Sequence, residues 1–172
     1  FFQVASIIST TGFATADYVL WPQLSRLVLV LLMFCGACAG STGGGIKCSR
    51  VLMLLRAIRR EIHQIAHPRS VEVVKLDGKV AEESTVHSVL VFVGCYGLIL
   101  LGAALVVSLD KMPFDVSFSA ALTCLSNVGP GLAAIGPTGN FSGFSDLSKL
   151  ALSLCMIVGR LEIFPILVMF SA

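Results

Sequence analysis

Residues 84–109 read STVHSVLVFVGCYGLILLGAALVVSL, and this stretch decides the fold class. It runs for 26 residues without Asp, Glu, Lys or Arg, and an α-helix needs only about 20 mostly apolar residues to cross a bilayer. The whole chain has the same character, because 56% of its 172 residues are hydrophobic and only 13% are charged. This composition excludes a disordered chain, and a net charge of +2 is too small for a nucleic-acid-binding module. The sequence therefore predicts an integral membrane protein.

Further apolar stretches lie on both sides of this span. Residues 147–172 form a second candidate span, interrupted by Lys149, Arg160 and Glu162. A third runs from Leu24 to Ala39 and then meets a run of Gly, Ser and Thr at 40–45. We expect all three to be membrane helices, the third ending at the Gly-rich run.

Two shorter apolar stretches, 1–8 and 116–125, cannot cross a bilayer. About ten helical residues rise only about 15 Å, half of the bilayer. Each stretch is followed by turn-forming residues, Ser-Thr-Thr-Gly-Phe at 9–13 and Ser-Asn-Val-Gly-Pro-Gly at 126–131. We interpret each pair as a re-entrant loop, in which a short helix enters the membrane and an extended segment returns. A purely structural hairpin in a transporter bundle is the alternative.

The two re-entrant loops belong to an internal repeat. Residues 2–12 align with 119–129 at an offset of 117, which pairs Gly12 with Gly129. After six extra residues in the second copy, Gly36 aligns with Gly159. Each unit is a helix, a pore loop and a helix, and both run in the same direction. We predict the end of one unit at 1–60, a connector at 61–83 and a complete unit at 84–172.

The positive charges predict the orientation of these units. Eight of the twelve Lys and Arg residues lie between Lys47 and Lys79, and cytoplasmic segments carry such an excess. Residues 47–83 are therefore predicted to be cytoplasmic, with a turn or short hairpin within 69–83. Both re-entrant loops then enter the membrane from outside.

Re-entrant loops can conduct cations. Backbone carbonyls that point at a common axis can replace the hydration shell of K⁺, and glycine allows the positive φ that such a segment uses. The carbonyls of Thr10, Thr11, Asn127 and Val128 are the predicted K⁺ ligands. The complete predicted selectivity filter consists of Thr10, Thr11, Gly12, Phe13, Asn127, Val128 and Gly129.

Four motifs occur in a fixed order at 9–13, 40–47, 127–132 and 159–164. Together they resemble the Trk/Ktr/HKT superfamily of potassium transporters, and Trp21-Pro22 with His67-Pro68-Arg69 is similar to its TrkH branch. The resemblance implies an all-α, polytopic membrane fold of four units around one pseudo-fourfold pore, with this chain supplying the end of the third unit and the fourth. It implies potassium uptake across a bacterial inner membrane and a homodimer. It also implies a cytoplasmic, TrkA-like regulatory subunit that binds the nucleotide, with no cofactor in this chain.

The Gly-rich run is the predicted gate. The residues predicted for the gate in this region are Gly40, Ser41, Thr42, Gly43, Gly44 and Gly45 of the run, together with Lys47. An Arg within a span is unfavourable by about 2.5–3.5 kcal/mol or more unless it meets a partner or water. The repeat aligns Arg160 with Ala37, just before the Gly-rich run, so we hypothesise that Arg160 holds this loop across the pore. A structural pair between Arg160 and a Glu of a neighbouring helix is the alternative.

Other motifs carry weaker signals. Ile46 separates Gly45 from Lys47, so the Gly-rich run departs from a phosphate-binding loop. Cys35 and Cys38 lack a second pair for a zinc site. His63 and His67 are spaced for a metal, yet are better read as an exposed helix end. No nucleophile–base or metal set converges, so the chain is predicted not to be an enzyme. A secondary transporter with broken helices, for a small solute or coupled to sodium, is the alternative function.

Overall fold

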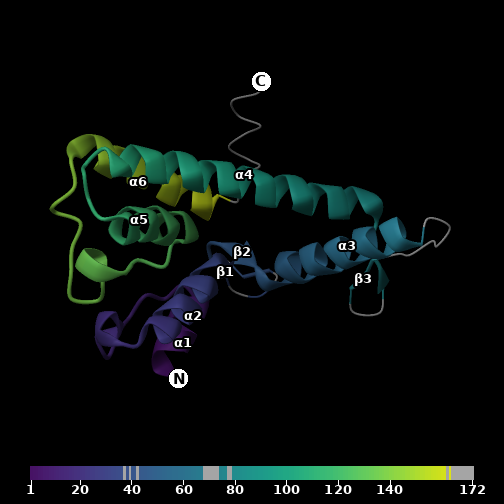
Figure 1. The fold of residues 1–172 in the computed structure, drawn as a ribbon, viewed down its shortest axis with the longest axis horizontal. Helices are drawn as coiled ribbons and strands as arrows, with labels where there is room; N and C mark the ends of the chain where they lie inside the picture. The colour runs from purple at the N-terminus through teal and green to yellow at the C-terminus, as the bar shows by residue number, and fades with distance from the viewer. Residues whose placement is uncertain are drawn as a thin grey trace.

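The computed structural model describes residues 1–36, 38, 40, 41, 43–67, 74–76, 79–161 and 163. Within these ranges the fold is helical, as predicted (Figure 1). The helices are α1 (Phe2–Ile8), α2 (Gln23–Phe34), α3 (Cys48–Ala66), α4 (Glu83–Ser108), α5 (Phe114–Ser126) and α6 (Asp146–Arg160), with 3-10 turns η1 (Tyr18–Leu20) and η2 (Ala133–Ile135). Two strand pairs are very short: β1 (Cys35–Gly36) runs parallel to β2 (Ile46–Lys47), and β3 (Lys75–Leu76) runs antiparallel to β4 (Lys79–Val80).

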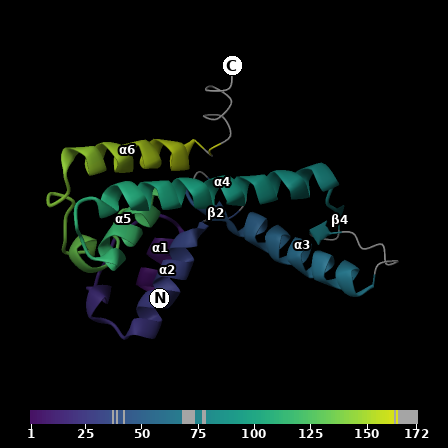
Figure 2. The ribbon, with the colours of Figure 1, turned by 45° about the horizontal axis from the view of Figure 1, so that its top comes forward.

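Helix α4 runs along the long axis of the molecule (Figure 1). Its 26 residues rise about 39 Å, and among the described helices it alone is long and apolar enough to cross a membrane. Helices α2 and α5 are apolar but shorter, as the re-entrant and broken-helix interpretations require. In Figures 1 and 2, α5 and α6 lie beside the C-terminal half of α4, while α3 leaves the bundle near the N-terminal half of α4. Only the part of the predicted span 147–172 up to 161, together with 163, lies within the described residues.

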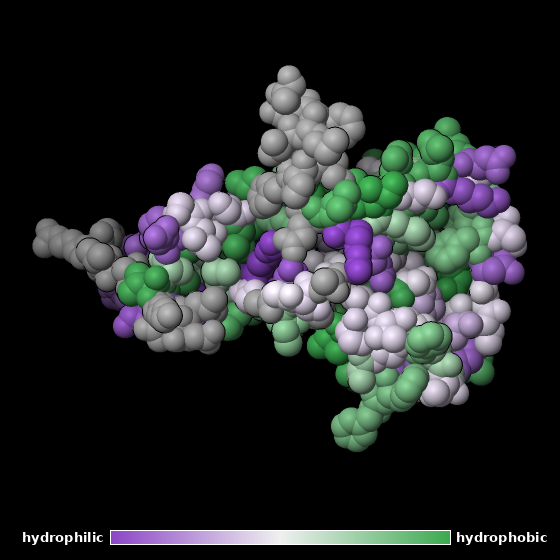
Figure 3. Space-filling view, turned by 180° about the vertical axis from the view of Figure 1, so that it is seen from behind, coloured by the Kyte–Doolittle hydropathy of each residue, from purple (hydrophilic) through white to green (hydrophobic). Residues whose placement is uncertain are grey.

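The core is built around the short helix α5. Every residue of α5 from Val116 to Ser126 is buried except Phe118. Helix α4 buries one stripe, which includes Phe92 and Tyr96, against this core, and its other face exposes Leu98, Leu101 and Leu105. Exposed leucines on a helix of this length suit lipid contact. Figure 3 shows polar residues near the middle of one face as well as toward both ends of the long axis, with apolar surface between them.

A small second cluster holds α3 against the start of α4. Ala57, Val74 and Val86 are buried together. The predicted hairpin is confirmed by the β3–β4 pair, although its turn at 77–78 lies outside the described residues. Arg56 donates to the Lys75 carbonyl, and the Arg60 guanidinium lies 2.5 Å from the Glu83 carboxylate. The connector therefore fixes where α3 meets α4.

The predicted helix 24–39 is wrong at its C-terminal end, because α2 stops at Phe34. Cys35 and Gly36 leave the helix to pair with Ile46 and Lys47 as parallel strands. A Cβ at Gly36 would overlap the Gly44 carbonyl oxygen, so this close backbone approach requires glycine. Described residues on both sides of the Gly-rich run, Cys35 with Gly36 and Ile46 with Lys47, are therefore non-helical, so the break is wider than 40–45.

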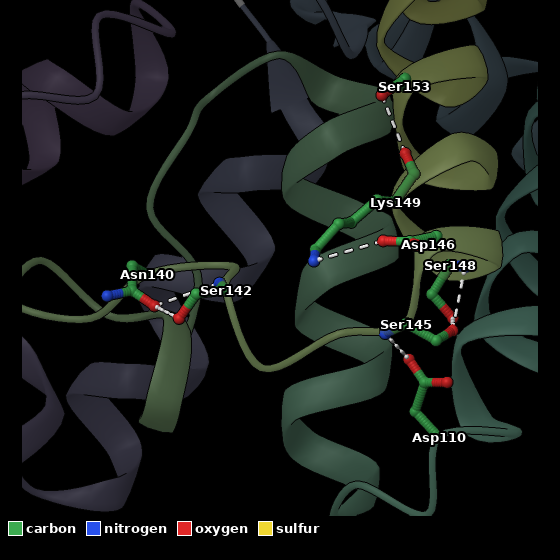
Figure 4. A network of polar contacts seen from close by, with 8 residues as sticks. All are labelled: Asp110, Asn140, Ser142, Ser145, Asp146, Ser148, Lys149 and Ser153. Atoms are coloured by element: carbon green, nitrogen blue, oxygen red, sulfur yellow. Dashed lines mark hydrogen bonds and ion pairs between the residues drawn. The ribbon is translucent and has the colours of Figure 1, made fainter.

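A polar network fixes the start of α6 to the end of α4 (Figure 4). Ser145 is the N-cap of α6, and its hydroxyl accepts from the Ser148 backbone N–H at 3.3 Å. The Ser145 backbone N–H in turn donates to the Asp110 carboxylate at 3.0 Å. Hydrogen bonds from the side chain and then the backbone of Ser145 lower the pKa of Asp110. These bonds therefore hold the end of the loop between α5 and α6 against the C-terminal end of α4.

We expect the Asp110 contact to make folding stability sensitive to acid. A carboxyl whose pKa is lowered by folding stabilises the protein above its unfolded pKa of about 3.9, and this contribution is lost as the pH falls through the folded pKa. The melting temperature of the full-length protein should therefore exceed that of Asp110→Asn near pH 7, and the difference should shrink below about pH 4. Thermal unfolding followed across this range measures it. Parallel pH profiles for the two proteins would contradict the assignment.

Candidate functional site

The two predicted re-entrant turns, the first turn (9–13) and the second turn (126–131), share one backbone geometry. Helix α1 ends before Thr10 with φ 54°, and α5 ends before Asn127 with φ 55°. Two residues further on, Gly12 has φ 77° and Gly129 has φ 105°. Both pairs are separated by the offset of 117 that the sequence repeat predicts. The repeat is therefore present in the backbone as well as in the sequence.

Matching hydrogen bonds hold the two turns. The Ser6 hydroxyl donates to the Phe13 carbonyl at 2.6 Å, and the Thr123 hydroxyl donates to the Pro130 carbonyl at 3.1 Å. Thr11 N–H donates to the Ser6 carbonyl at 2.9 Å, as Val128 N–H does to the Thr123 carbonyl at 3.0 Å. In each short helix one residue, Ser6 or Thr123, holds the following segment at two points. Its hydroxyl donates one hydrogen bond and its backbone carbonyl accepts another.

These bonds do not use the carbonyls of six residues within the two turns. Among the hydrogen bonds between described residues, none ends on a carbonyl oxygen of the six residues Thr10, Thr11, Gly12, Asn127, Val128 and Gly129. Phe13 differs, because its carbonyl already accepts from Ser6 and its side chain is 73% exposed. The predicted filter set therefore divides into six residues with available carbonyls and Phe13, which closes the first turn.

The structure brings the two turns into direct contact. A Cβ at Gly12 would overlap the Val128 carbonyl oxygen and would lie 3.1 Å from Cδ of Pro130. Tyr18, fully buried after the first turn, donates its hydroxyl to the Gly131 carbonyl at 3.0 Å. Residues more than 110 positions apart in the sequence are thus joined at one site.

Polar contacts with α4 and α6 support the second turn. The hydroxyls of Tyr96 and Ser126 lie 2.7 Å apart, and both side chains are buried. The Asn127 amide donates to the Met156 carbonyl of α6 at 3.2 Å. The sequence analysis missed the supporting residues Ser6, Tyr18, Tyr96 and Thr123. The repeat could have revealed Ser6 and Thr123, since the offset of 117 aligns their two hydroxyls.

The Gly-rich run lies against the end of α5, next to the second turn. A Cβ at Gly44 would overlap the Ser126 carbonyl oxygen and would lie 3.0 Å from Cβ of Asn127. Ser41 accepts from the Gly43 N–H at 3.2 Å, and Lys47 is the residue that precedes α3. Gly40 and Gly45 have positive φ. Thr42, also predicted for the gate, lies outside the described residues.

Arg160 ends α6 on the other side of Asn127. It lines a cavity of about 470 Å³ together with Asn127, Met156, Ile157 and Leu161. A Cβ at Gly159 would overlap the Leu125 carbonyl and would lie 2.9 Å from the Asn127 amide nitrogen. Asn127 therefore lies between two segments: its Cβ is close to Gly44 of the Gly-rich run, and its amide nitrogen is close to Gly159 at the end of α6. Ala37, which the repeat aligns with Arg160, and Glu162 lie outside the described residues.

The histidine pair lies apart from this site. The rings of His63, in the last turn of α3, and His67, which follows the helix, lie 4.9 Å apart and are exposed. Within the described ranges, no three His, Cys, Asp or Glu side chains gather in a group that could hold a metal ion.

Comparison with known proteins places this geometry in a family. The profile of the TrkH family, described as a cation transport protein, matches residues 1–172. The Trk system potassium uptake protein TrkG of Escherichia coli K12 is 36% identical over 171 residues, which are 99% of this chain and 35% of that protein. TrkH of the same strain is 34% identical over the same shares.

A solved structure agrees with the sequence relatives. The crystal structure of the potassium transporter TrkH from Vibrio parahaemolyticus matches with a TM-score of 0.88 and 36% sequence identity. The match covers 98% of this chain and 36% of that chain. The chain therefore spans about a third of the length of the relatives that it matches, and it has their polytopic, all-α membrane transporter fold.

Proposed function

Because the chain belongs to the TrkH family of cation transport proteins, we propose that it supplies part of a potassium uptake pathway across a bacterial inner membrane. The observation that carries this proposal is the pair of touching turns with available carbonyls, Thr10 to Gly12 and Asn127 to Gly129. Carbonyl oxygens can replace the water around K⁺. The names of the relatives, Trk system potassium uptake proteins, support the choice of ion.

The helices that precede the turns favour a cation. Helices α1 and α5 both end at a turn, and the C-terminal end of a helix carries partial negative charge. In a pore of four such units, two more turns from elsewhere in the full-length protein would complete the ring of carbonyls. Thr10, Thr11, Asn127 and Val128 are the proposed ligands of K⁺, which is the transported ion and not a resident cofactor.

The Gly-rich run with Lys47, together with Arg160, forms the proposed gate. Gly44 lies against Ser126 and Asn127, so the run sits beside the turn that the ion would pass. Arg160 lines a cavity that Asn127 also lines. A guanidinium there repels a waiting cation, and it can donate to the carbonyls of an unwound loop. Movement of the run away from Asn127 would open the pathway.

The remaining parts of the proposal concern topology and partners. The excess of Lys and Arg supports a cytoplasmic position for residues 47–83, where α3 and the β3–β4 hairpin would form part of the docking surface for a TrkA-like regulatory subunit. That subunit would carry the regulatory nucleotide. The family relationship also supports a multi-pass homodimer, with lipid against the exposed leucines of α4.

The test is potassium-dependent growth. The full-length protein, expressed in bacteria that lack potassium uptake systems, should restore growth at micromolar to low millimolar K⁺, and purified protein in vesicles should pass Rb⁺ in preference to Na⁺. Flux of a neutral solute, or growth rescue that requires added sodium, would instead favour the secondary transporter. Protease cleavage within 61–83 from outside sealed cells would contradict the proposed orientation.

A further inference from the structure

A second cavity, away from the two turns, lies between the start of α3 and the start of α4. Its volume is about 310 Å³. Of the described residues that line it, two are cations, three carry hydroxyls and none is acidic. The lining consists of Gly40, Lys47, Ser49, Arg50, Met53, Thr85, Ser88 and Val89. This lining suits an anion rather than the transported cation.

The position of Arg50 is fixed by packing. Its guanidinium carbon lies 4.1 Å from the centroid of the Phe92 ring, and Phe92 is 3% exposed on α4. A cation held over an aromatic face loses little further freedom when it binds a ligand. An Arg fork, a Lys point charge and the hydroxyls of Ser49 and Thr85 form a donor set that recognises phosphate oxygens. The Ser88 hydroxyl does not add to this set, because it donates to the Ser84 carbonyl at 2.8 Å. The first turn of α3, which has no side-chain N-cap, adds favourable partial charge.

The depth of the cavity indicates where the phosphate comes from. Helix α4 rises about 39 Å, whereas the hydrocarbon core of a bilayer is about 30 Å thick. Each end of α4 therefore extends about 5 Å into the headgroup region. Thr85 and Ser88 lie in the first two turns of α4, on the side that carries the positive charges. Thr85 is thus at the depth of lipid headgroups on the predicted cytoplasmic face, and Ser88 lies just inside the edge of the hydrocarbon core.

We propose that this cavity binds a phosphate group, supplied by an anionic lipid of the inner leaflet or by a small soluble phosphate. Binding follows from the lining alone. Gly40, at the start of the Gly-rich run, lines the same cavity, so an occupant contacts the proposed gate. That consequence for transport and the choice of the inner leaflet rest on the proposed function, whereas the phosphate site itself does not.

The test uses the full-length protein in lipid nanodiscs with two probes. One arm measures phosphatidylglycerol retained from mixed phosphatidylglycerol and phosphatidylcholine membranes by mass spectrometry. The other titrates inorganic phosphate into protein in pure phosphatidylcholine. Ser88→Asp places a carboxylate in the cavity from an exposed position, and Arg50→Gln removes the fork. Arg59→Gln removes an exposed cation of α3 outside the cavity and is the matched control.

Both cavity variants should weaken binding about tenfold, with Arg59→Gln close to wild type. If the loss is in retained phosphatidylglycerol, the ligand is a lipid headgroup; if it is in the phosphate titration, the ligand is soluble. Should Arg50→Gln not fold, Ser88→Asp alone decides the matter. Equal binding by wild type and Ser88→Asp in both arms, or no binding by wild type, overturns the site. Failure to transport K⁺ with phosphate binding intact would instead refute the proposed function.

Discussion

Replacing Gly12 by Ala should lower K⁺ uptake by the full-length protein at least tenfold. Gly12 has φ 77°, a region in which an L-residue is strained by about 1–2 kcal/mol. The added Cβ would also overlap the Val128 carbonyl oxygen, one of the proposed K⁺ ligands. Relief of the overlap must move one turn away from the other, which disturbs the spacing of oxygens on which coordination depends. Rb⁺ flux into vesicles, with Na⁺ as competitor, measures both rate and preference.

Two other glycines separate strain from overlap. Gly129 has φ 105°, but a Cβ there meets nothing within 4 Å, so Gly129→Ala should impair uptake less than Gly12→Ala. Gly97, in the middle of α4, also has open space around it, and Ala favours a helix more than Gly does. Gly97→Ala should therefore transport normally. Unchanged uptake and unchanged ion preference in Gly12→Ala would exclude the first turn from the conduction pathway.

The turns after α1 and α5 could be predicted because they depend on local chemistry repeated at a fixed offset. A short apolar helix, followed by residues that tolerate positive φ, specifies the same ending wherever it occurs. Thr10 and Asn127 differ in side chain, yet they take nearly the same φ. The hairpin before α4 was likewise predicted from its polar, turn-forming composition. In each of these cases the information lies within about fifteen consecutive residues.

The contacts that join the turns could not be read from such windows. Tyr18 donates to the Gly131 carbonyl across more than a hundred residues. The sequence around Tyr18 carries no signal that identifies this acceptor. Tyr96 is likewise one ring in a continuous apolar span, where any residue of the buried stripe could face the core. The early end of α2 at Phe34 has the same cause, because the strand pairing of Cys35 and Gly36 needs Ile46 and Lys47 to return beside them.

Removal of Gly43, Gly44 and Gly45, or replacement of Arg160 by Ala, should raise cation flux about tenfold, the effect of one interaction of about 1.4 kcal/mol that holds a gate closed. Gly44 lies against Ser126 and Asn127, so the deletion withdraws the backbone that lies beside the second turn. Arg160→Ala removes a charge that shares a cavity with Asn127. Either change favours the open state without touching the carbonyls of Thr10 to Gly12. Flux is measured in vesicles without a regulatory subunit, so that only the intrinsic gate is observed.

Two substitutions distinguish a gate from a general effect of charge or packing. Arg160→Lys keeps the positive charge but loses the planar fork, so its flux should lie between those of wild type and Arg160→Ala. Lys149→Ala removes a cation from the other end of α6, where Lys149 pairs with Asp146 at 3.8 Å, and should leave flux unchanged. If the deletion and Arg160→Ala both fold and pass ions no faster than wild type, then Arg160 and the Gly-rich run do not close the pathway. Arg160 would then serve as a structural partner of a neighbouring helix.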